Sequence, residues 1–318
     1  MIQSARAGER HDEIEAFFRE RFTTDNPLIT EAVKRMLAAG GKRLRPRITL
    51  LAAQTHDTQS ERHMQLAAYM ELIHVATLIH DDVVDNAQTR RGVNATAIDY
   101  GNRISVLAGD YLFAWIFKNV TQFYAPPIPN ILSATLAEIC DGEVLQLRSL
   151  GDLNVSLQSY IDIVARKTAS LFAASAQCGA IAGGAPLQDV EALRAFGLAY
   201  GIGFQMRDDL LDVTADAAAL GKPVGNDLAE RKMTIPLILA LRSGSQEFAG
   251  MVERLYAGRE PDTAAVIAGI RQSGAVDETR AQIAEYARRA EDAIDGLENT
   301  AAKAELQRLA GELLEEVS

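Results

Sequence analysis

Two short stretches of the chain each place three aspartates at positions i, i+1 and i+4 of an apolar, helix-like segment. On a helix, positions i and i+4 share a face, whereas position i+1 lies about 100° away. Each cluster therefore predicts carboxylates that point together into one space at the rim of a pocket. The clusters are Asp81, Asp82 and Asp85 in "HDDVVD" and Asp208, Asp209 and Asp212 in "RDDLLD".

One such cluster alone is also consistent with a solvated helix end, but its repetition favours a shared chemical purpose. If the clusters face each other, their repulsion raises carboxyl pKa values or requires cations. Mg²⁺ suits this arrangement, because it binds through one or two carboxylates while phosphate oxygens complete its shell. The pattern predicts a diphosphate site bridged by Mg²⁺ rather than a hydrolytic pair of carboxylates.

Basic residues flank both acidic clusters, next to glycines or predicted helix ends. Arginine forks and lysine point charges suit diphosphate oxygens, although each residue alone is also consistent with an ordinary surface charge. These residues are Lys42, Arg43 and Arg45 in "GGKRLRP", Arg90 and Arg91 before Gly92, Lys167 before Thr168, and Lys222 and Lys232 after the second cluster.

The elements that must position these side chains are helices. Apolar residues recur at helical spacing almost throughout, and period-two strand patterns are nearly absent. Helix starts are expected at Asp25 or Asn26, before Pro27, and at Ser60. We predict an all-α fold in which residues 1–318 form a single domain of long helices around a large core.

The composition restricts the class of protein. A chain of 318 residues with 48% hydrophobic content can build a large core, and a net charge of −11 argues against general nucleic-acid binding. The uncharged run 168–188 is rich in Ala, Ser and Gly, which predicts a buried helix rather than an integral membrane segment. No secretory signal opens the chain, so we expect a cytoplasmic protein in which Cys140 and Cys178 are small buried hydrophobic residues.

On these motifs the sequence resembles the all-trans polyprenyl diphosphate synthases. The match runs from "GGKRLRP" through "HDDVVD", "RRG" and "KT" to "FQMRDDLLD" and "GKPVGNDL", in the order of the family, and spans most of the chain. The resemblance implies a bundle of long helices around a deep central cavity and a homodimer. It also implies Mg²⁺, with about three ions per site when substrate is bound.

The family roles carry over to matching residues. Asp81 and Asp85 would ligate Mg²⁺ on one wall with Asp208 opposite, whereas Asp82, Asp209 and Asp212 would bind directly, through water or in an outer shell. The isopentenyl diphosphate site would comprise Lys42, Arg45, His74 and Arg91. The allylic diphosphate site would comprise Arg90, Lys167, Lys222 and Lys232, with Thr168 and Gln205 nearby. The resemblance assigns catalysis to Asp81, Asp85, Arg90, Lys167, Asp208 and Lys222.

The implied reaction is ionisation, condensation and elimination. Mg²⁺ and the basic residues stabilise the departing diphosphate of an allylic substrate such as farnesyl or geranylgeranyl diphosphate. The double bond of isopentenyl diphosphate attacks the allylic cation, and a proton is then lost to pyrophosphate, the base expected from the family.

Product length should be set below the first aspartates. Ala76 and Thr77 lie about one turn before Asp81, where short-chain members carry bulky aromatic residues, so the cavity floor is expected to be open. Because Ala76 and Thr77 leave the floor open, we predict a long product of about C35 to C50, near C40. Each further isoprene unit would descend roughly one helical turn. The aromatic residues that could end the cavity, or that simply pack in the core, are Tyr111, Phe113, Trp115 and Phe117.

Arg207 and His80 each allow two interpretations, and the motifs must also be compared with three other functions. Arg207 replaces an expected aliphatic residue, and it either points outward or pairs with an acidic neighbour. His80 is more consistent with a packed histidine than with the metal centre of a phosphohydrolase. A silent subunit of a heteromeric synthase is disfavoured by the intact acidic and basic motifs, and a terpene cyclase has less use for a second diphosphate site.

Overall fold

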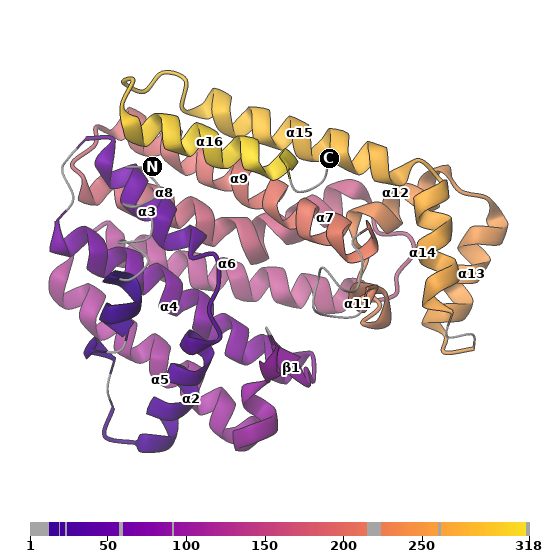
Figure 1. Ribbon diagram of the computed structural model, residues 1–318, viewed down its shortest axis with the longest axis horizontal. Helices are drawn as coiled ribbons and strands as arrows, with labels where there is room; N and C mark the ends of the chain where they lie inside the picture. Colours follow the sequence, from indigo (N-terminus) through magenta and orange to yellow (C-terminus); the bar gives the residue numbers. More distant parts are fainter. Residues whose placement is uncertain are drawn as a thin grey trace. The chain divides into compact units, whose positions relative to one another are not determined.

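The structure, a computed structural model, describes residues 13–18, 20–22, 24–56, 60–90, 92–214, 224–259 and 262–315. Nearly all of its regular structure is helical, which confirms the predicted all-α fold. The elements are α2 (Pro27–Ala38), α3 (Leu44–Gln54), α4 (Glu61–Val84), β1 (Thr89–Arg90), β2 (Val93–Asn94), α5 (Thr96–Phe123), α6 (Ile128–Ser149), α7 (Leu157–Val164), the π-helix η1 (Ala165–Ala169), α8 (Ser170–Ala182), α9 (Leu187–Thr214), α11 (Asn226–Ala229), α12 (Ile235–Ser243), α13 (Gln246–Tyr256), α14 (Thr263–Gln272), α15 (Ala275–Ala293) and α16 (Ala301–Glu315) (Figure 1).

Two helices begin where the sequence predicts. The side chain of Asn26 accepts hydrogen bonds from the amides of Leu28 and Ile29, and a proline follows it in the first turn of α2. Ser60 caps α4 in the same way, through the amide of His63. Because such caps satisfy backbone donors that have no partner within the helix, they determine where the helices start.

The chain divides into two compact units. Unit 1 comprises Met1–Ser133 and Ser175–Val190, and unit 2 comprises Ala134–Ala174 and Glu191–Ser318. The first acidic cluster therefore belongs to unit 1 and the second to unit 2. A single domain over the whole chain stays a prediction.

In unit 1, α4 packs against α3 on one side and α5 on another. Trp115 of α5 makes edge-to-face ring contacts with Tyr69 of α4 (5.9 Å) and with Phe22 (5.4 Å). At the other end of the α4–α5 contact, a Cβ atom on Gly109 would collide with the imidazole ring of His80. The absence of a side chain at this glycine therefore lets the two helices approach closely around His80.

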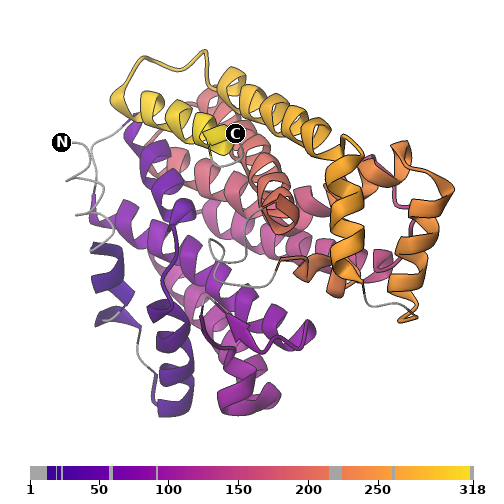
Figure 2. The ribbon, with the colours of Figure 1, turned by 45° about the vertical axis from the view of Figure 1, so that its right-hand side comes forward.

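In unit 2, α9 lies directly against the segment formed by η1 and α8. A Cβ atom on Gly201 would lie 2.6 Å from the Cα atom of Ala169, and one on Gly197 would meet the backbone of Phe172. This close approach brings Gln205, one turn after Gly201, next to Thr168. Elsewhere in the unit, α15 and α16 run side by side and α12 packs on α15 (Figures 1 and 2).

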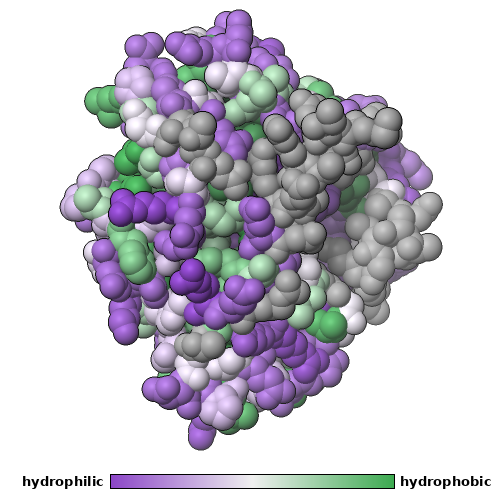
Figure 3. Space-filling model, turned by 60° about the vertical axis from the view of Figure 1, so that its left-hand side comes forward, coloured by the Kyte–Doolittle hydropathy of each residue, from purple (hydrophilic) through white to green (hydrophobic). Residues whose placement is uncertain are grey.

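The way in which the helices bury their apolar sides determines the character of the surface and the exposure of the two cysteines. On the face in Figure 3, hydrophilic residues predominate and hydrophobic residues form separate patches. Within the described residues, no helix combines the length and the hydropathy that crossing a membrane requires. Cys178 is buried in α8 as predicted, but the prediction is wrong for Cys140, which is exposed on α6.

Candidate active site

The first acidic cluster forms the C-terminal end of α4. Asp81 and Asp85 are half-buried and share a side of the helix, as their spacing predicts, and the amide of Asp85 donates to the carbonyl oxygen of Asp81 (2.8 Å). The last turn of α4, all of it described, contains no basic residue, although the carbonyl end of a helix favours positive charge. Carboxylate oxygens in this position suit a divalent cation.

Asp82 lies in a different environment from its two neighbours. Its side chain is fully buried, and its Oδ1 accepts a hydrogen bond from Nε of Arg90 (2.8 Å), while Nη2 of Arg90 lies 2.6 Å from the same oxygen. Burial raises the pKa of Asp82, and Arg90 acts in the opposite direction. Because Arg90 belongs to the β1–β2 hairpin, the ion pair attaches the hairpin to the end of α4. Among the three predicted placements of Asp82, this geometry favours an outer one.

The second cluster closes α9 with a similar division between exposed and buried carboxylates. The side chain of Asp208 is 46% exposed, whereas Asp209 and Asp212 are buried. Oδ2 of Asp212 accepts a hydrogen bond from the amide of Asp227 (3.1 Å). The described last turn of α9 again lacks a basic residue. Asp208 is therefore the member of this cluster that is most accessible to a metal ion.

A chain of hydrogen bonds holds Asp209. Its Oδ2 accepts from the hydroxyl of Tyr160 (2.7 Å) and its Oδ1 from Nε2 of Gln205 (2.8 Å). Gln205 in turn accepts from the hydroxyl of Thr168 (3.0 Å). Burial raises the pKa of Asp209, and the bonds from Tyr160 and Gln205 partly offset this rise. Thr168 and Gln205, both predicted to lie near the allylic diphosphate, are thus in contact with each other.

Two residues of this network were not assigned a function from the sequence. Tyr160 lies on α7, far from any acidic motif in the sequence, and no local pattern indicates its contact with Asp209. Asp227 lies within "GKPVGND", so this motif could have identified it as a candidate site residue. Burial, followed by repulsion from Asp209 and Asp212, raises the pKa of Asp227 to about 8.

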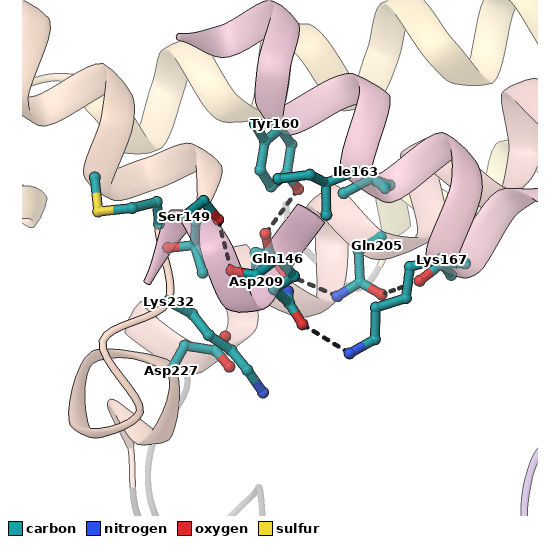
Figure 4. Close-up of a pocket in the computed structure, with 13 residues that line it drawn as sticks. Gln146, Ser149, Tyr160, Ile163, Lys167, Gln205, Asp209, Asp227 and Lys232 are labelled. Carbon is teal, nitrogen blue, oxygen red and sulfur yellow. Dashed lines mark hydrogen bonds between the residues drawn. The ribbon is translucent and has the colours of Figure 1, made fainter. Parts of the chain in front are cut away.

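A polar cavity of about 140 Å³ in unit 2 is lined by four of the residues predicted for the allylic site, Lys167, Thr168, Gln205 and Lys232, whereas Arg90 belongs to unit 1. Figure 4 shows Lys167 and Lys232 among the residues that line this cavity, with Asp209 hydrogen-bonded to Tyr160 and Gln205. Nζ of Lys167 donates to Oε1 of Gln146 (2.7 Å) and forms an ion pair with Glu143, and Lys232 pairs with Glu230. The lining residues are Gln146, Ser149, Tyr160, Ile163, Val164, Lys167, Thr168, Gln205, Asp209, Asp227, Lys232, Met233 and Thr234.

The backbone that carries Lys167 and Thr168 is a π-helical turn, η1. Such turns are rare and occur frequently at functional sites. Gly142 of α6 lies directly against it, since a Cβ atom there would stand 2.5 Å from the amide nitrogen of Lys167. The wide turn and the glycine together position the lysine backbone.

The predicted isopentenyl diphosphate residues that the structure describes lie in unit 1. Lys42 is exposed in the loop before α3, Arg45 is half-buried in the first turn of α3, and His74 is half-buried on α4. Two further predicted residues, Arg91 of this site and Lys222 of the allylic site, lie outside the described residues.

The structure decides between the two alternatives for Arg207. Its side chain is only 4% exposed, so the outward, solvated placement is wrong. Nη2 lies 3.4 Å from Oδ1 of Asp208, and the guanidinium carbon stands 4.6 Å from the ring centre of Phe204. Arg207 therefore pairs with an acidic neighbour, and stacking on an aromatic ring helps to offset its burial.

His80 is a packing histidine. Its Nε2 lies 3.1 Å from the carbonyl oxygen of Val106, and its ring contacts Phe113 with centroids 5.7 Å apart. Among the described residues, no group of three or more His, Cys, Asp or Glu side chains is assembled to hold a metal. A metal site centred on His80 therefore has no support, and carboxylates at the helix ends would need further oxygen ligands from a substrate.

The residues expected to control product length lie on or beside α4. Ala76 is fully buried, and Thr77 is half-buried and donates a hydrogen bond to the carbonyl oxygen of His74 (2.8 Å). Trp115 belongs to the aromatic packing in unit 1, which favours the core alternative for this residue. Tyr111, in contrast, is 37% exposed on α5.

An all-helical protein with acidic helix ends and a lysine-lined polar cavity is suited to transfer chemistry on a diphosphate. Comparison with known proteins agrees. The sequence model of the Polyprenyl synthetase family matches residues 26–272. The chain is 38% identical over 239 residues to octaprenyl diphosphate synthase of Escherichia coli K12, covering 75% of this chain and 74% of that protein. It is 39% identical over 285 residues to heptaprenyl diphosphate synthase component 2 of Geobacillus stearothermophilus, covering 88% and 87%.

Solved structures give the same result for the fold. Polyprenyl synthase of Caulobacter crescentus CB15, determined in complex with calcium and isoprenyl diphosphate, superposes with a TM-score of 0.92 at 37% identity, over 98% of this chain and 95% of that one. Relatives named for shorter products also match, among them geranylgeranyl diphosphate synthase of Methanosarcina mazei at 34% identity, covering 88% of this chain and 87% of that protein.

The chain belongs to the Polyprenyl synthetase family and has the isoprenoid synthase fold. It is a polyprenyl diphosphate synthase, a prenyltransferase of isoprenoid biosynthesis. Members of the family use divalent metal ions and act on isopentenyl and allylic diphosphates. This assignment excludes the phosphohydrolase and terpene cyclase alternatives.

Proposed function

We propose that this enzyme extends an allylic starter, such as farnesyl or geranylgeranyl diphosphate, to an all-trans product of about C35 to C50. The observation that carries the proposal is the small side chain of Ala76, one turn before the metal-binding aspartates on α4, where a bulky residue would close the cavity. The neighbouring Thr77 is also small. Relatives named for heptaprenyl and octaprenyl products support the same range.

Burial of the growing chain supplies the driving force for a long product. Each added isoprene unit contributes about 4 kcal/mol, at about 0.8 kcal/mol per methylene-sized group. Elongation is therefore favourable for as long as the cavity accepts another unit. We propose that Ala76 and Thr77 permit this descent and that residues deeper along α5 stop it.

We further propose that both acidic clusters bind divalent metal ions. Their donor sets fit a hard cation, because Asp81, Asp85 and Asp208 are partly exposed carboxylates near the ends of α4 and α9. Asp81, Asp85 and Asp208 would hold Mg²⁺, with about three ions bound when substrate is present. The bound ions would neutralise the leaving diphosphate. Asp82 would act through Arg90, and Asp209 and Asp212 would support Asp208 from their buried positions.

The basic residues divide between the two substrates. Lys167 and Lys232, with Arg90 and Lys222, would bind the allylic diphosphate and stabilise the charge that develops as its carbon–oxygen bond breaks. Lys167 and Lys232 are already held by carboxylates, which a diphosphate would replace. Lys42, Arg45, His74 and Arg91 would orient isopentenyl diphosphate, so that its double bond attacks the allylic cation. The released pyrophosphate would accept the proton that leaves.

A product assay tests this proposal. The purified full chain is incubated with Mg²⁺, labelled isopentenyl diphosphate and farnesyl or geranylgeranyl diphosphate, and the dephosphorylated products are sized. Products of about C35 to C50 are expected. A ladder ending at C20 to C25 would overturn the long-chain proposal but leave the prenyltransferase class intact, and turnover by the chain alone would reject a silent-subunit role.

We also propose that the enzyme is a cytoplasmic homodimer. Large hydrophobic residues are exposed along one side of α5, where Val106, Leu107 and Tyr111 are 39%, 55% and 37% exposed. An apolar stripe of this kind is expected to be covered by a second copy of the chain. Sedimentation equilibrium should give the mass of two chains for the wild type, and Leu107→Glu should shift it towards one.

A further inference from the structure

The loop between α2 and α3 has an unusual backbone. Gly40 and Gly41 have φ values of 75° and 151°, and Arg43 has a φ of 47°. Glycine adopts such conformations readily, whereas a residue with a Cβ atom does so at a cost in free energy. Arg43 therefore remains in this conformation only because its surroundings hold it there.

Contacts of the Arg43 side chain keep the backbone in this conformation. It is 3% exposed, and its Nη1 donates to Oε1 of Glu71 on α4 (2.8 Å). Its Nε donates to Oε1 of Glu15 (2.8 Å), and its Nη2 donates to the carbonyl oxygen of Leu37 at the end of α2 (2.8 Å). The guanidinium carbon also lies 5.4 Å from the ring centre of Phe18. One buried side chain thus joins the residues 13–18, α2, α3 and α4.

Glu71 completes an ion pair that is buried on both sides, since its own side chain is also 3% exposed. Burial by itself would lower the pKa of Arg43, but Glu71 and Glu15 together raise it. A buried carboxylate left without its partner would be strongly unfavourable. The pair is therefore a fixed connection between the loop and α4.

This connection lies at the centre of the residues assigned to isopentenyl diphosphate. Lys42 directly precedes Arg43, and Arg45 follows it in the first turn of α3. On the other partner, His74 lies three residues after Glu71 and therefore on the same side of α4. The Arg43–Glu71 pair consequently fixes two groups of ligands, one on the loop and one on the helix, with respect to each other.

We propose that Arg43 and Glu71 are positioning residues for the isopentenyl diphosphate site. They hold Lys42 and Arg45 at the distance from His74 that one diphosphate requires, without binding the substrate themselves. The inference rests on the proposed roles of these three ligands. It predicts a defect mainly in the use of isopentenyl diphosphate, because Lys167 and Lys232 of the allylic site lie in unit 2 and the aspartates of α4 begin ten residues after Glu71.

Steady-state kinetics of the purified full chain test this proposal, with each substrate varied while the other is saturating. Arg43→Lys keeps the positive charge but removes the planar guanidinium that donates to several partners at once. Glu71→Gln keeps the shape of the side chain but removes its negative charge. Each should raise KM for isopentenyl diphosphate by about tenfold or more, as loss of a supporting partner typically does. KM for farnesyl diphosphate should stay within about twofold, since its ligands are untouched.

A double variant separates positioning from folding. Replacing both members with methionine removes the charges together, and such replacements often leave stability nearly unchanged. The double variant should remain folded by circular dichroism and still show the raised KM. Glu15→Gln alters the more exposed carboxylate, and it should raise the same KM by a smaller factor.

Arg21→Ala provides the matched control. Arg21 pairs with Glu61, which also lies on α4, but both side chains are exposed at 60% and 74%. This variant should change neither KM value. If folded variants of Arg43 or Glu71 bind isopentenyl diphosphate normally, or if both KM values rise together, the positioning role is wrong. Failure of every variant to fold would also overturn it, because the pair would then be a requirement of unit 1. A wild-type chain without condensation activity would instead contradict the proposed function.

Discussion

The hydroxyl of Tyr160 donates a hydrogen bond of 2.7 Å to Oδ2 of Asp209, and both groups are buried. This contact joins α7 to the acidic end of α9, in the unit that holds the lysine-lined cavity. Asp209 is thereby held in place beneath the more exposed Asp208. The contact indicates that the carboxylate supports its neighbour rather than meeting the metal ion freely.

Tyr160→Phe should weaken both stability and turnover. The substitution leaves Oδ2 of Asp209 buried without its donor, which should lower the free energy of unfolding by about 1–3 kcal/mol. kcat should fall as well, because we propose that Asp209 supports Asp208 at the metal site. Urea denaturation and steady-state assays measure the two effects. Tyr124→Phe removes a comparable hydroxyl bond to the carbonyl oxygen of Arg62 in unit 1, and it should cost stability with kcat preserved.

The aspartates that we propose as Mg²⁺ ligands should be indispensable. Asp81→Ala and Asp208→Ala should each lower kcat by about 10²- to 10³-fold, the usual effect of losing one group that stabilises developing charge. Asp277→Ala removes a carboxylate that is 83% exposed on α15, and it should leave turnover unchanged. Chelation of divalent ions should stop the wild-type reaction, and added Mg²⁺ should restore it. Near-normal turnover of either cluster variant would remove the bridging role.

Replacement of Ala76 by Phe should shorten the product. The larger ring would narrow the cavity proposed one turn before Asp81, so elongation should stop early. Because Ala76 is fully buried, the substitution should also lower stability by about 1–3 kcal/mol. Thin-layer chromatography of labelled products measures the length, and thermal melting measures the stability. Ala304→Phe, on the exposed side of α16, should yield wild-type products.

The close approach of Gly142 to η1 should not tolerate a methyl group. Gly142→Ala would place Cβ 2.5 Å from the amide nitrogen of Lys167 and should displace the π-helical turn. We expect a raised KM for the allylic diphosphate, measured with isopentenyl diphosphate saturating. Gly311→Ala offers a helical control with open space around it, and it should stabilise the protein by about 0.5–1 kcal/mol. Equal KM values for the two variants would contradict the role of η1.

Stability of the metal-free protein should fall as pH rises from about 4 to 8. Asp227 has its pKa raised from 3.8 to about 8 by burial, so over this interval the unfolded chain releases the proton that the folded chain retains. The stability that this group contributes is complete below the unfolded pKa and is lost as pH rises through the folded value. Urea midpoints across this range measure the trend. Asp227→Asn should reduce the slope, with Asp209, whose pKa burial also raises, accounting for part of the remainder, whereas a trend unchanged by this substitution would assign it to other groups.

Local patterns predicted the helices and their starts because caps and apolar spacing act within a few residues. Asn26 and Ser60 are examples, since each accepts amide hydrogen bonds from the first turn of its own helix. The shared side of Asp81 and Asp85 followed from helix geometry in the same way. The family motif likewise placed Thr168 and Gln205 near the same diphosphate, and the structure shows a hydrogen bond between them.

Contacts between distant segments could not be predicted in this way. The sequence left Arg207 undecided, because its direction depends on the position of Phe204 and on the packing around α9. The partner of Asp82 depends on how the β1–β2 hairpin folds back on α4. Tyr160 lies 49 residues from Asp209, so no local pattern relates the two. Cys140 was misplaced because a short apolar residue fits both sides of an amphipathic helix.

The π-helical turn determines how far α7 and α8, the helical segments before and after it, are rotated about the helix axis relative to each other. A π turn holds one residue more than an α turn, and one residue corresponds to a rotation of about 100° in a regular helix. Deleting a single residue from Ala165–Ala169 would therefore swing the hydroxyl of Tyr160 away from Asp209 while Thr168 kept its place beside α9. The alignment of Tyr160 with Thr168 along the cavity wall thus depends on the one additional residue of the π-helical turn.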